Sequence, residues 1–588
     1  MNRNQRNIAG KIYPEKLSHR FLIIAALALF FILKAPSILH AQNLEHIGKQ
    51  KPFTFSGNIG GGLNFYNSNE TSYTRDPFTW NLYGNFTPTI YSISLPFSFI
   101  INQYSKSYST PFAQFGMSPT YKWIKLDLGY RTMTMSPFTF DGQSFKGVGI
   151  ELTPKMFRFA AFYGSLNKAI SEDTTSGHLA MPQYGRKGYG ARIGVGNEAN
   201  HFDFIYFHAK DDSSSIKLIN QTETLTPQEN TVIGASSKFT FLKKIIWNTN
   251  VAVSALTQDV SAQKVNKDTL TKTIDKLFYK LINFRNGTIT SWAGQSTLTF
   301  LLKSFNTTFG YRRVEADFKS LGVPYMLNDI EALQWNGGLT VAKGKVNINA
   351  NVNEQHNDIS KKLESELHTL TGTLSLSAIM STHANLNISG SVVNLNQTDG
   401  TTHISDSVRL DQQIYNISVT PSFTFGKQTA IQTLTPSFNY SLQNDNNPLT
   451  SAYGNSNTLT GVLAYSCSFT QQSWSLNGNL LYNLYTQDTL QYTSYGVNIG
   501  AGVQLLKDKS LGLNASVGYL LNQYSSGEAK NNITGSFSFH YSVAKHHSFS
   551  GYFNMVSTPP TSNTLQKQLP YTVTTNNIAA GLSYNYSF

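Results

Sequence analysis

The chain is short of charge, of cysteine and of long apolar runs. Asp, Glu, Lys and Arg together make up 13% of its 588 residues, about half the share usual in globular proteins. Its single cysteine, Cys467, cannot form an internal disulfide, so a disulfide-held framework is excluded. No stretch after Leu33 is long and apolar enough for a membrane helix. Strands with lipid on one face and water on the other would bury the apolar side chains in lipid without needing any long apolar run.

Basic clusters of the kind that bind nucleic acid are also missing. The formal net charge is +13, and residues 1–41, with six basic residues and one Glu, contribute +5 of it. The remaining +8 is spread over the rest of the chain, and no stretch interleaves Lys and Arg with aromatic residues. We therefore exclude nucleic acid as a partner.

Catalytic and metal-binding patterns are equally scarce. The thirteen His residues are dispersed along the chain, and no Gly-rich phosphate loop is present. No Ser/His pair, paired carboxylates or His/Cys/Asp cluster with the spacing of metal ligands stands out. The expectation is therefore a protein that is not an enzyme and that needs no cofactor or metal.

The N-terminus has the pattern of a secretory signal. A basic lead is followed by thirteen apolar residues, 21–33 (FLIIAALALFFIL), a run too short to span a bilayer. We predict a signal peptide over residues 1–41, cleaved after Ala41, although Lys34 and Leu39 are unusual there; an uncleaved anchor is the alternative. Residues 42–52 would then be a short periplasmic segment and 53–588 a barrel, which leaves no room for a globular plug domain before the first strand.

Apolar and polar residues alternate in strand-length segments from Phe53 onward. In residues 578–588 every second residue is apolar, and the residues between are small or polar. A period of two is the strand period, so such a segment has one apolar and one wettable face. This last segment, with Tyr584, Tyr586 and Phe588, resembles the C-terminal sorting signature of bacterial outer-membrane β-barrels. The resemblance implies recognition by the barrel-assembly machinery during insertion.

The connections between these segments alternate between short and long. Twelve short turns and thirteen longer polar loops imply an all-β fold: a single transmembrane antiparallel β-barrel of about 26 strands, with 22–26 compatible. Short turns would face the periplasm and long loops the outside. A β-sandwich or a fibrous β adhesin also alternates, but its connections need not switch length in step and its outer face would carry more Lys and Glu.

Three loop segments break the strand pattern. Residues 271–284 have helical apolar spacing and predict a short amphipathic helix within the 263–286 segment. That helix either folds into the mouth of the barrel and closes the pore, or packs on neighbouring loops. Residues 358–368 are a weaker helix candidate. Residues 133–145 (MTMSPFTFDGQSF) contain aromatics that can cap the mouth, dock a partner or pack over the rim.

The inner face divides into two parts. In the last thirteen strands its residues are mostly Asn, Ser, Thr and Gly. In the first half, alternation places a mixed-charge patch on the lumen side, with Glu151 expected opposite Arg158 across a turn. The patch consists of Lys125, Asp127, Arg131, Glu151, Arg158 and Arg192, with Arg312 joining from further along. Such a patch forms either a selectivity constriction through its local field or a salt-bridge ladder that stiffens the wall.

Two stretches carry a family resemblance. Residues 115–168 (FGMSPTYKWIKLDLGYRTMTMSPFTFDGQSFKGVGIELTPKMFRFAAFYGSLNK) and the sequence YRRVEADFKSLG beginning at Tyr311 resemble large uncharacterised outer-membrane β-barrel proteins of the Bacteroidota. The resemblance covers about a fifth of the chain. It implies a location in the cell envelope but no particular activity.

The sequence therefore favours an outer-membrane barrel that acts as a pore or passive channel for small hydrophilic solutes, with outer-membrane lipid around it. A protein from another class is the alternative: a structural subunit of a secretion or insertion complex, with an occluded lumen and protein partners in the envelope.

Overall fold

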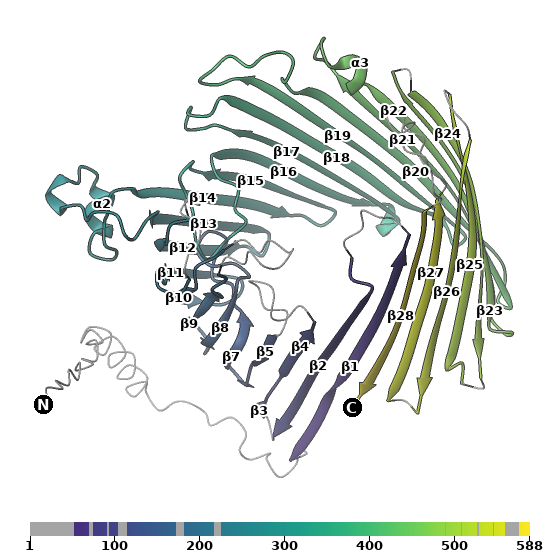
Figure 1. Cartoon of the computed structure of the whole chain (residues 1–588), viewed down its shortest axis with the longest axis horizontal. Coiled ribbons are helices and arrows are strands. Elements are labelled where there is room, and N and C mark those ends of the chain that lie inside the picture. Colours follow the sequence, from purple (N-terminus) through teal and green to yellow (C-terminus); the bar gives the residue numbers. More distant parts are fainter. Residues whose placement is uncertain are drawn as a thin grey trace, which may run out of the picture. The chain divides into compact units, whose positions relative to one another are not determined.

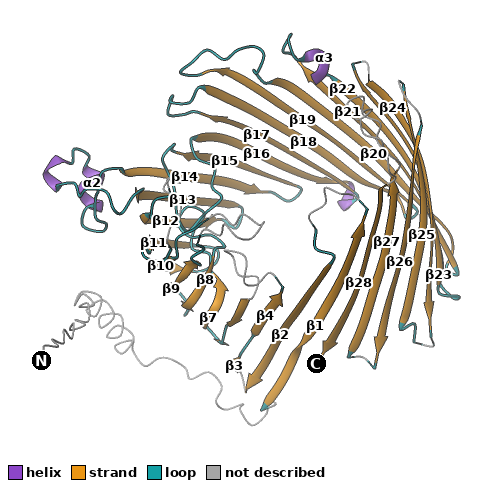
Figure 2. Ribbon diagram, viewed as in Figure 1, coloured by secondary structure: helices purple, strands orange, loops and turns teal. Residues whose placement is uncertain are grey.

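The computed structural model describes residues 52–69, 75–90, 93–103, 114–171, 182–216, 225–488, 490–506, 508–525, 529–544, 546–558 and 575–588. The predicted signal peptide, residues 1–41, and nearly all of the 42–52 segment lie outside them, so both stay predictions. Residues 55–588 form one compact unit. Strands make up almost all of it, with only short helical pieces in the connections (Figure 2).

Over the described residues, one antiparallel sheet contains 28 strands. Its first half consists of β1 (Phe53–Ser68), β2 (Phe78–Ile90), β3 (Ile93–Ser94), β4 (Phe97–Asn102), β5 (Gln114–Met117), β6 (Thr120–Tyr121), β7 (Ile124–Thr132), β8 (Ser144–Leu152), β9 (Phe157–Asn167), β10 (Arg186–Gly196), β11 (His201–Asp211), β12 (Glu229–Phe241), β13 (Ile245–Thr257) and β14 (Thr288–Leu301).

The second half consists of β15 (Phe305–Val314), β16 (Ile330–Val341), β17 (Val346–Asn357), β18 (Ser365–Ser381), β19 (Ala384–Asp399), β20 (Asp411–Lys427), β21 (Ala430–Asp445), β22 (Ser456–Phe469), β23 (Trp474–Gln487), β24 (Leu490–Leu505), β25 (Leu511–Tyr524), β26 (Lys530–Val543), β27 (His547–Thr558) and β28 (Thr575–Ser587). The helical pieces are η2 (Lys267–Thr269), α2 (Thr273–Phe278), η3 (Ala342–Gly344) and α3 (Ser451–Gly454).

Two of the strands are each broken in the middle by proline. Pro96 separates β3 from β4, and Pro119 separates β5 from β6. The halves still pair in order, β3 with β6 and β4 with β5. Each broken strand therefore counts as one strand spanning the barrel wall. Proline has no N–H to give to the ladder, which explains the breaks. The 28 strands therefore correspond to 26 strands that span the barrel wall, and the predicted strand number is confirmed.

The sheet closes on itself. β1 pairs with β28 from Asn58 opposite Ser587 to Ser68 opposite Asn577, and the two strands lie side by side (Figure 1). Beyond the ladder, the Phe588 N–H donates to the Gly57 carbonyl oxygen at 2.9 Å. The Phe588 ring lies 4.5 Å from the Phe55 ring, centroid to centroid. A closed sheet has no free edge, so the fold is an antiparallel β-barrel.

The connections segregate by length as predicted. The short ones, such as 153–156, 242–244 and 342–345, lie at the end where β1 begins and β28 finishes, which we call the short-turn end. The others lie at the opposite, long-loop end and are mostly longer, although only two residues separate Gln487 of β23 from Leu490 of β24 there. The short turn predicted at residues 91–92 lies outside the described residues.

The helix predicted at residues 358–368 is wrong. Asp358 Oδ1 accepts the backbone N–H groups of Lys362 and Leu363 at 2.7 and 2.9 Å, which holds a turn. β18 then begins at Ser365 and pairs with β19. Local apolar spacing predicted a helix, but the aspartate turn and the sheet pairing determine the backbone.

The outward face carries exposed apolar side chains around the barrel. Examples are Leu374 (55% exposed), Phe438 (58%), Ile499 (64%) and Val517 (64%). They alternate with polar residues that face inward. An apolar surface this continuous requires lipid around it. Among the described residues, no helix is both long and apolar enough to cross a membrane.

Closure at β28 generates the first testable prediction. Replacing Phe588 with Asp puts a charge beside Phe55 and the neighbouring Tyr586, whose ring lies 5.0 Å from that of Phe588. We expect the level of folded protein in the membrane fraction to fall severalfold, because the closing ladder loses its aromatic end. Quantitative immunoblotting of fractionated cells measures this, with Phe553→Asp on β27 as a control for a charge on the apolar face. Undiminished membrane levels of the Phe588 variant would contradict the prediction.

Candidate functional site

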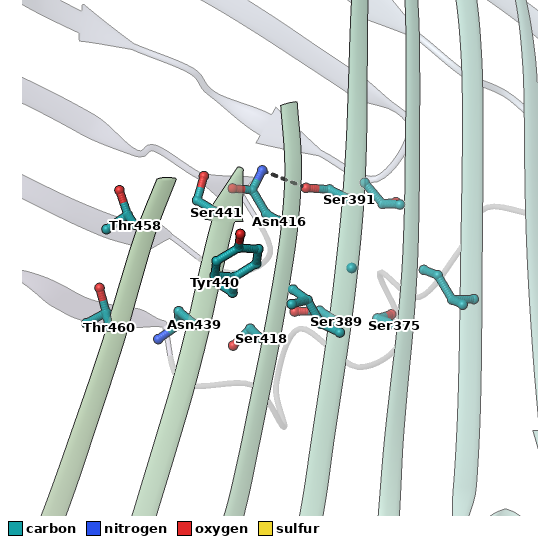
Figure 3. Close-up of a pocket in the computed structure, with 14 residues that line it drawn as sticks. Ser375, Ser389, Ser391, Asn416, Ser418, Asn439, Tyr440, Ser441, Thr458 and Thr460 are labelled. Carbon is teal, nitrogen blue, oxygen red and sulfur yellow. Dashed lines mark hydrogen bonds between the residues drawn. The ribbon is translucent and has the colours of Figure 1, made fainter. Parts of the chain in front are cut away.

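The inner wall of the second half is polar and uncharged where it is hollowed. A hollow of about 410 Å³ lies across β18–β22. Asn416 Nδ2 donates to Ser391 Oγ at 3.1 Å across two of these strands (Figure 3). The polar residues lining the hollow are all Ser, Thr or Asn: Thr373, Ser375, Ser389, Ser391, Asn416, Ser418, Asn439, Ser441, Thr458 and Thr460. Leu374, Gly390, Ile417 and Tyr440, which alternate with them along the strands, also border it. Such a wall is wetted by water and favours neither sign of ion.

The inner wall of the first half carries a chain of ion pairs near the short-turn end. Lys125 Nζ lies 2.7 Å from Glu151 Oε1 and 3.3 Å from Asp127 Oδ2. Glu151 also lies 4.0 Å from Arg192, which in turn lies 4.0 Å from Asp203. The chain therefore links β7, β8, β10 and β11, and it brings together four of the predicted residues, Lys125, Asp127, Glu151 and Arg192.

Arg158 completes the chain, but with a partner that differs from the predicted one. β8 and β9 pair so that Glu151 lies opposite Ala160, not Arg158. The turn spans residues 153–156 as predicted, but the ladder between β8 and β9 begins at Leu152 opposite Phe159, so the register is offset by two residues and Arg158 lies beyond the end of β8. Its guanidinium instead binds Asp203 through two hydrogen bonds, of 2.8 and 3.0 Å. Both side chains are largely buried, at 15% and 3% exposed.

A glycine permits this contact across a whole strand. Gly194 of β10 is the register partner of both Arg158 on β9 and Asp203 on β11. A Cβ atom at Gly194 would lie 1.9 Å from Asp203 Oδ1, so any other residue would displace the carboxylate. The absence of a side chain on the middle strand thus lets two residues two strands apart form a bidentate pair.

The other two predicted patch residues lie apart from these ion pairs. Arg131 Nη1 donates to Ser98 Oγ at 2.7 Å. Arg312, on the inward face of β15, lies with its guanidinium carbon 5.6 Å from the centre of the Phe138 ring. Arg312 therefore supports a loop and does not extend the ion-pair chain.

The aromatic loop 133–143 folds into the barrel and packs on the inner wall. Phe140 is fully buried, with its ring centroid 4.3 Å from Phe162 and 5.6 Å from Phe207, both inward-facing wall residues. A Cβ atom at Gly234 of β12 would lie 2.7 Å from Thr139 Cγ2, so the loop approaches the wall backbone closely. The loop therefore packs on the wall, as in the third predicted position, but it lies deeper in the barrel than the rim.

A second loop, 315–329, lies beside the first and is tied to it. Ser320 Oγ donates to the Thr139 carbonyl oxygen at 2.6 Å, and Asp141 N–H donates to the Gly322 carbonyl oxygen at 3.4 Å. Phe318 and Leu321 join Phe138 and Phe140 in one buried apolar cluster on the wall of β8–β16. The two loops together form what we call the inner shelf.

Asn230 of β12 holds the second loop to the wall. Its Nδ2 donates to the Lys319 carbonyl oxygen at 3.3 Å and to Ser254 Oγ at 2.8 Å, and its Oδ1 accepts the Leu321 N–H at 3.1 Å. Burial lowers the pKa of the Lys319 ammonium, and Arg186 lowers it further while Asp211 raises it. The loop is therefore held by both its backbone and its apolar side chains.

The helix predicted within residues 263–286 forms, as α2, but it does not lie in the mouth. Phe278, Ile282 and Phe284 pack in one cluster with Ala255 and Val253 of β13. Those two residues alternate with the inward-facing Ser254, which binds the inner loop through the Lys319 carbonyl oxygen at 2.6 Å. The segment therefore covers the outer side of the wall. The predicted alternative in which it closes the pore is wrong.

Sequence reasoning missed two residues of the inner wall. Asp203 stands between Phe202 and Phe204, where a single acid in an apolar strand already signals an inward partner. Asn230 gave no signal, since an Asn at the start of a strand is common. Its role depends on a loop 89 residues further along the chain.

No protein-family model and no curated protein matches the chain. Solved structures do match. The copper transporter OprC is 7% identical with a TM-score of 0.40, over 91% of this chain and 80% of that chain. Pseudomonas aeruginosa OpdK with vanillate is 11% identical with a TM-score of 0.29, over 91% and 99%. Acinetobacter baumannii OccAB2 is 9% identical with a TM-score of 0.30, over 66% and 96%. Identities this low do not transfer a substrate, and the barrel assignment rests on the strand pairings.

The buried ion pair gives a stability prediction. Asp203→Asn keeps the shape of the side chain but leaves the buried Arg158 without its carboxylate and Arg192 with Glu151 alone. Breaking a buried pair in this way costs about 3–5 kcal/mol. Guanidinium unfolding of the barrel in detergent micelles measures the loss. Asp399→Asn, which removes a carboxylate from exposed ion pairs with His403 and Arg409, is the matched control and should cost far less, because solvent screens these pairs. Equal costs for the two variants would refute burial as the cause.

The tether at Asn230 gives a prediction about the inner shelf. Asn230→Ala removes hydrogen bonds to the Lys319 carbonyl oxygen and the Leu321 N–H, so loop 315–329 should open more often. A loss of about 1–3 kcal/mol corresponds to roughly 5- to 150-fold faster cleavage by trypsin after Lys319. Asn416→Ala, which removes a wall hydrogen bond away from the loops, should leave the cleavage rate unchanged. An unchanged rate for Asn230→Ala would show that the apolar cluster alone holds the loop.

Proposed function

We propose that this barrel is a passive channel for small hydrophilic solutes in the bacterial outer membrane. The observation that carries the proposal is the contrast between its two faces: exposed apolar residues outward, and uncharged Ser, Thr and Asn inward across β18–β22. A ring of 26 tilted strands has a perimeter on the order of 160 Å. The two loops of the inner shelf line only the wall of β8–β16, so the polar wall borders the remaining opening.

Selectivity between anions and cations should be weak. The ion-pair chain and Arg131 together hold four basic and three acidic residues, and most of these charges neutralise one another at the wall. The field that remains is screened within about 8 Å at physiological salt. Of the two roles predicted for the mixed-charge patch, these ion pairs support stiffening of the wall over selection of ions.

The proposal includes an envelope location like that of the Bacteroidota barrels which the sequence resembles. It also includes export through the N-terminal signal and recognition of Tyr584, Tyr586 and Phe588 during insertion. The closed membrane-type barrel and its terminal strand support both steps.

One observation favours a second function, that of a structural subunit with an occluded lumen. Loop 315–329 exposes Tyr325 (98%) and Leu327 (67%), apolar side chains that a protein partner would cover. A partner bound there would sit on the inner shelf and narrow the opening. Conductance of the purified barrel in planar bilayers separates the two functions, because a subunit with an occluded lumen would not conduct.

A cysteine pair tests the channel directly. In a Cys467→Ala background, Ser418→Cys places a thiol on the polar wall, while Ile417→Cys places one on the lipid side, where Ile417 is 51% exposed. A charged, membrane-impermeant thiol reagent should change the conductance of the Ser418 variant and leave the Ile417 variant unaffected. Absence of conductance in the wild-type barrel, or equal responses of the two variants, would reject the channel.

A further inference from the structure

The segment 258–287 lies against the lipid side of the barrel. Phe278, Ile282 and Phe284 are at most 4% exposed and pack with Ala255 on the outward face of β13. Thr290 Oγ1, on the neighbouring β14, donates to Asp275 Oδ1 of α2 at 2.5 Å. Thr290 is the register partner of Ala255, so both contacts fix α2 on the same outward patch of wall. Figure 1 shows α2 beyond the strand ends of β13 and β14.

Two exposed tryptophans indicate where this patch lies relative to the membrane surface. Trp247, 45% exposed, faces outward near the short-turn end of β13. A strand needs about 9–11 residues to cross the hydrocarbon core. Counted from Trp247 as the first residue, β13 therefore reaches the opposite membrane surface at residues 255–257. Trp292, opposite Val253, is 42% exposed beneath the guanidinium of Arg313. Exposed Trp is typical of the membrane–water interface. The helix thus packs where β13 leaves the lipid.

The exposed side of the segment is basic. Between residues 258 and 287 there are six basic residues and three acidic ones. Two of the acids, Asp259 and Asp275, accept hydrogen bonds from Ser261 and Thr290. No ion pair among the described residues uses the exposed lysines of the segment, which are Lys264, Lys267, Lys272, Lys276 and Lys280.

Apolar side chains stand beside these lysines. Leu277, within α2, is 55% exposed, and Leu281, in the turn that follows α2, is 40% exposed. Lys276 and Lys280 each directly precede one of these leucines, and Lys272 is the N-cap residue of α2. Exposed apolar side chains next to lysines are typical of segments that lie at a membrane surface.

We propose that residues 258–287 form a membrane-surface anchor that binds anionic lipid headgroups around the barrel. Leu277 and Leu281 enter the acyl-chain boundary, and Lys272, Lys276 and Lys280 contact the headgroup anions. Each lysine near an anionic surface strengthens such binding about fivefold. The anchor is independent of solute passage, because it lies on the opposite face of the wall from the lumen.

A thiol placed at Leu277 tests the anchor. The full chain with Leu277→Cys and Cys467→Ala is reconstituted in phosphatidylcholine bilayers, with or without phosphatidylglycerol. Labelling by a membrane-impermeant maleimide is then timed against Leu449→Cys, a residue of another long loop that is 63% exposed. In the anionic bilayer we expect Leu277→Cys to label at least about tenfold more slowly than the reference. Adding Lys272→Gln, Lys276→Gln and Lys280→Gln should remove most of that protection.

Two controls make the outcome decisive. Lys361→Gln with Lys362→Gln removes two lysines from a different long loop and should leave the protection unchanged. The same labelling in detergent micelles measures any shielding by the protein itself. Labelling of Leu277→Cys as fast as Leu449→Cys in the anionic bilayer would overturn the anchor. Equal protection in micelles, in neutral bilayers or in the triple lysine variant would overturn the role of anionic headgroups.

Discussion

Backbone pairing at the seam between β1 and β28 is the constraint on which the rest of this molecule depends. In hydrocarbon no water is present to satisfy an unpaired N–H or C=O, so a spanning sheet must close completely. The ladder from Asn58–Ser587 to Ser68–Asn577 closes it. Each strand then has one face in lipid and one in the interior. The alternation of residues, the loop lengths and the placement of charges all follow from that division.

The two halves of the barrel use their inner faces differently. β18–β22 present short uncharged polar side chains that need only water. β7–β11 carry ion pairs, and Asp127 and Asp203 among them are almost fully buried. Buried charges require partners, and here the partners come from neighbouring strands and, at Gly194, from two strands away. The wall of β8–β16 also contributes a buried apolar cluster, which the inner shelf covers. The second half therefore borders solvent, and the first half is a packed structure.

Much of the fold could be predicted because its rules are local. A period of two gives the strands, and alternating turn lengths give their number and direction. What failed depended on register or on distant segments. Glu151 was paired with Arg158 because the register of the β8–β9 ladder was taken two residues off, and Asp203 was overlooked because its partners stand on other strands. The inner position of Phe140 and the outer position of α2 are set by packing against strands far away in sequence. No local pattern specifies on which side of a wall a loop will lie.

The seam also sets the order in which the molecule can form. Asn58 Nδ2 donates to Asn585 Oδ1 across 527 residues of chain, so this contact is among the most non-local that the chain can make. Contacts of this kind form slowly, because the loop-closure entropy must be overcome before they contribute. Until residues 575–588 are in place, β1 keeps an unpaired edge that can join any other strand. The chain therefore completes its fold only with its last segment, and its kinetic vulnerability lies in the interval before that segment arrives.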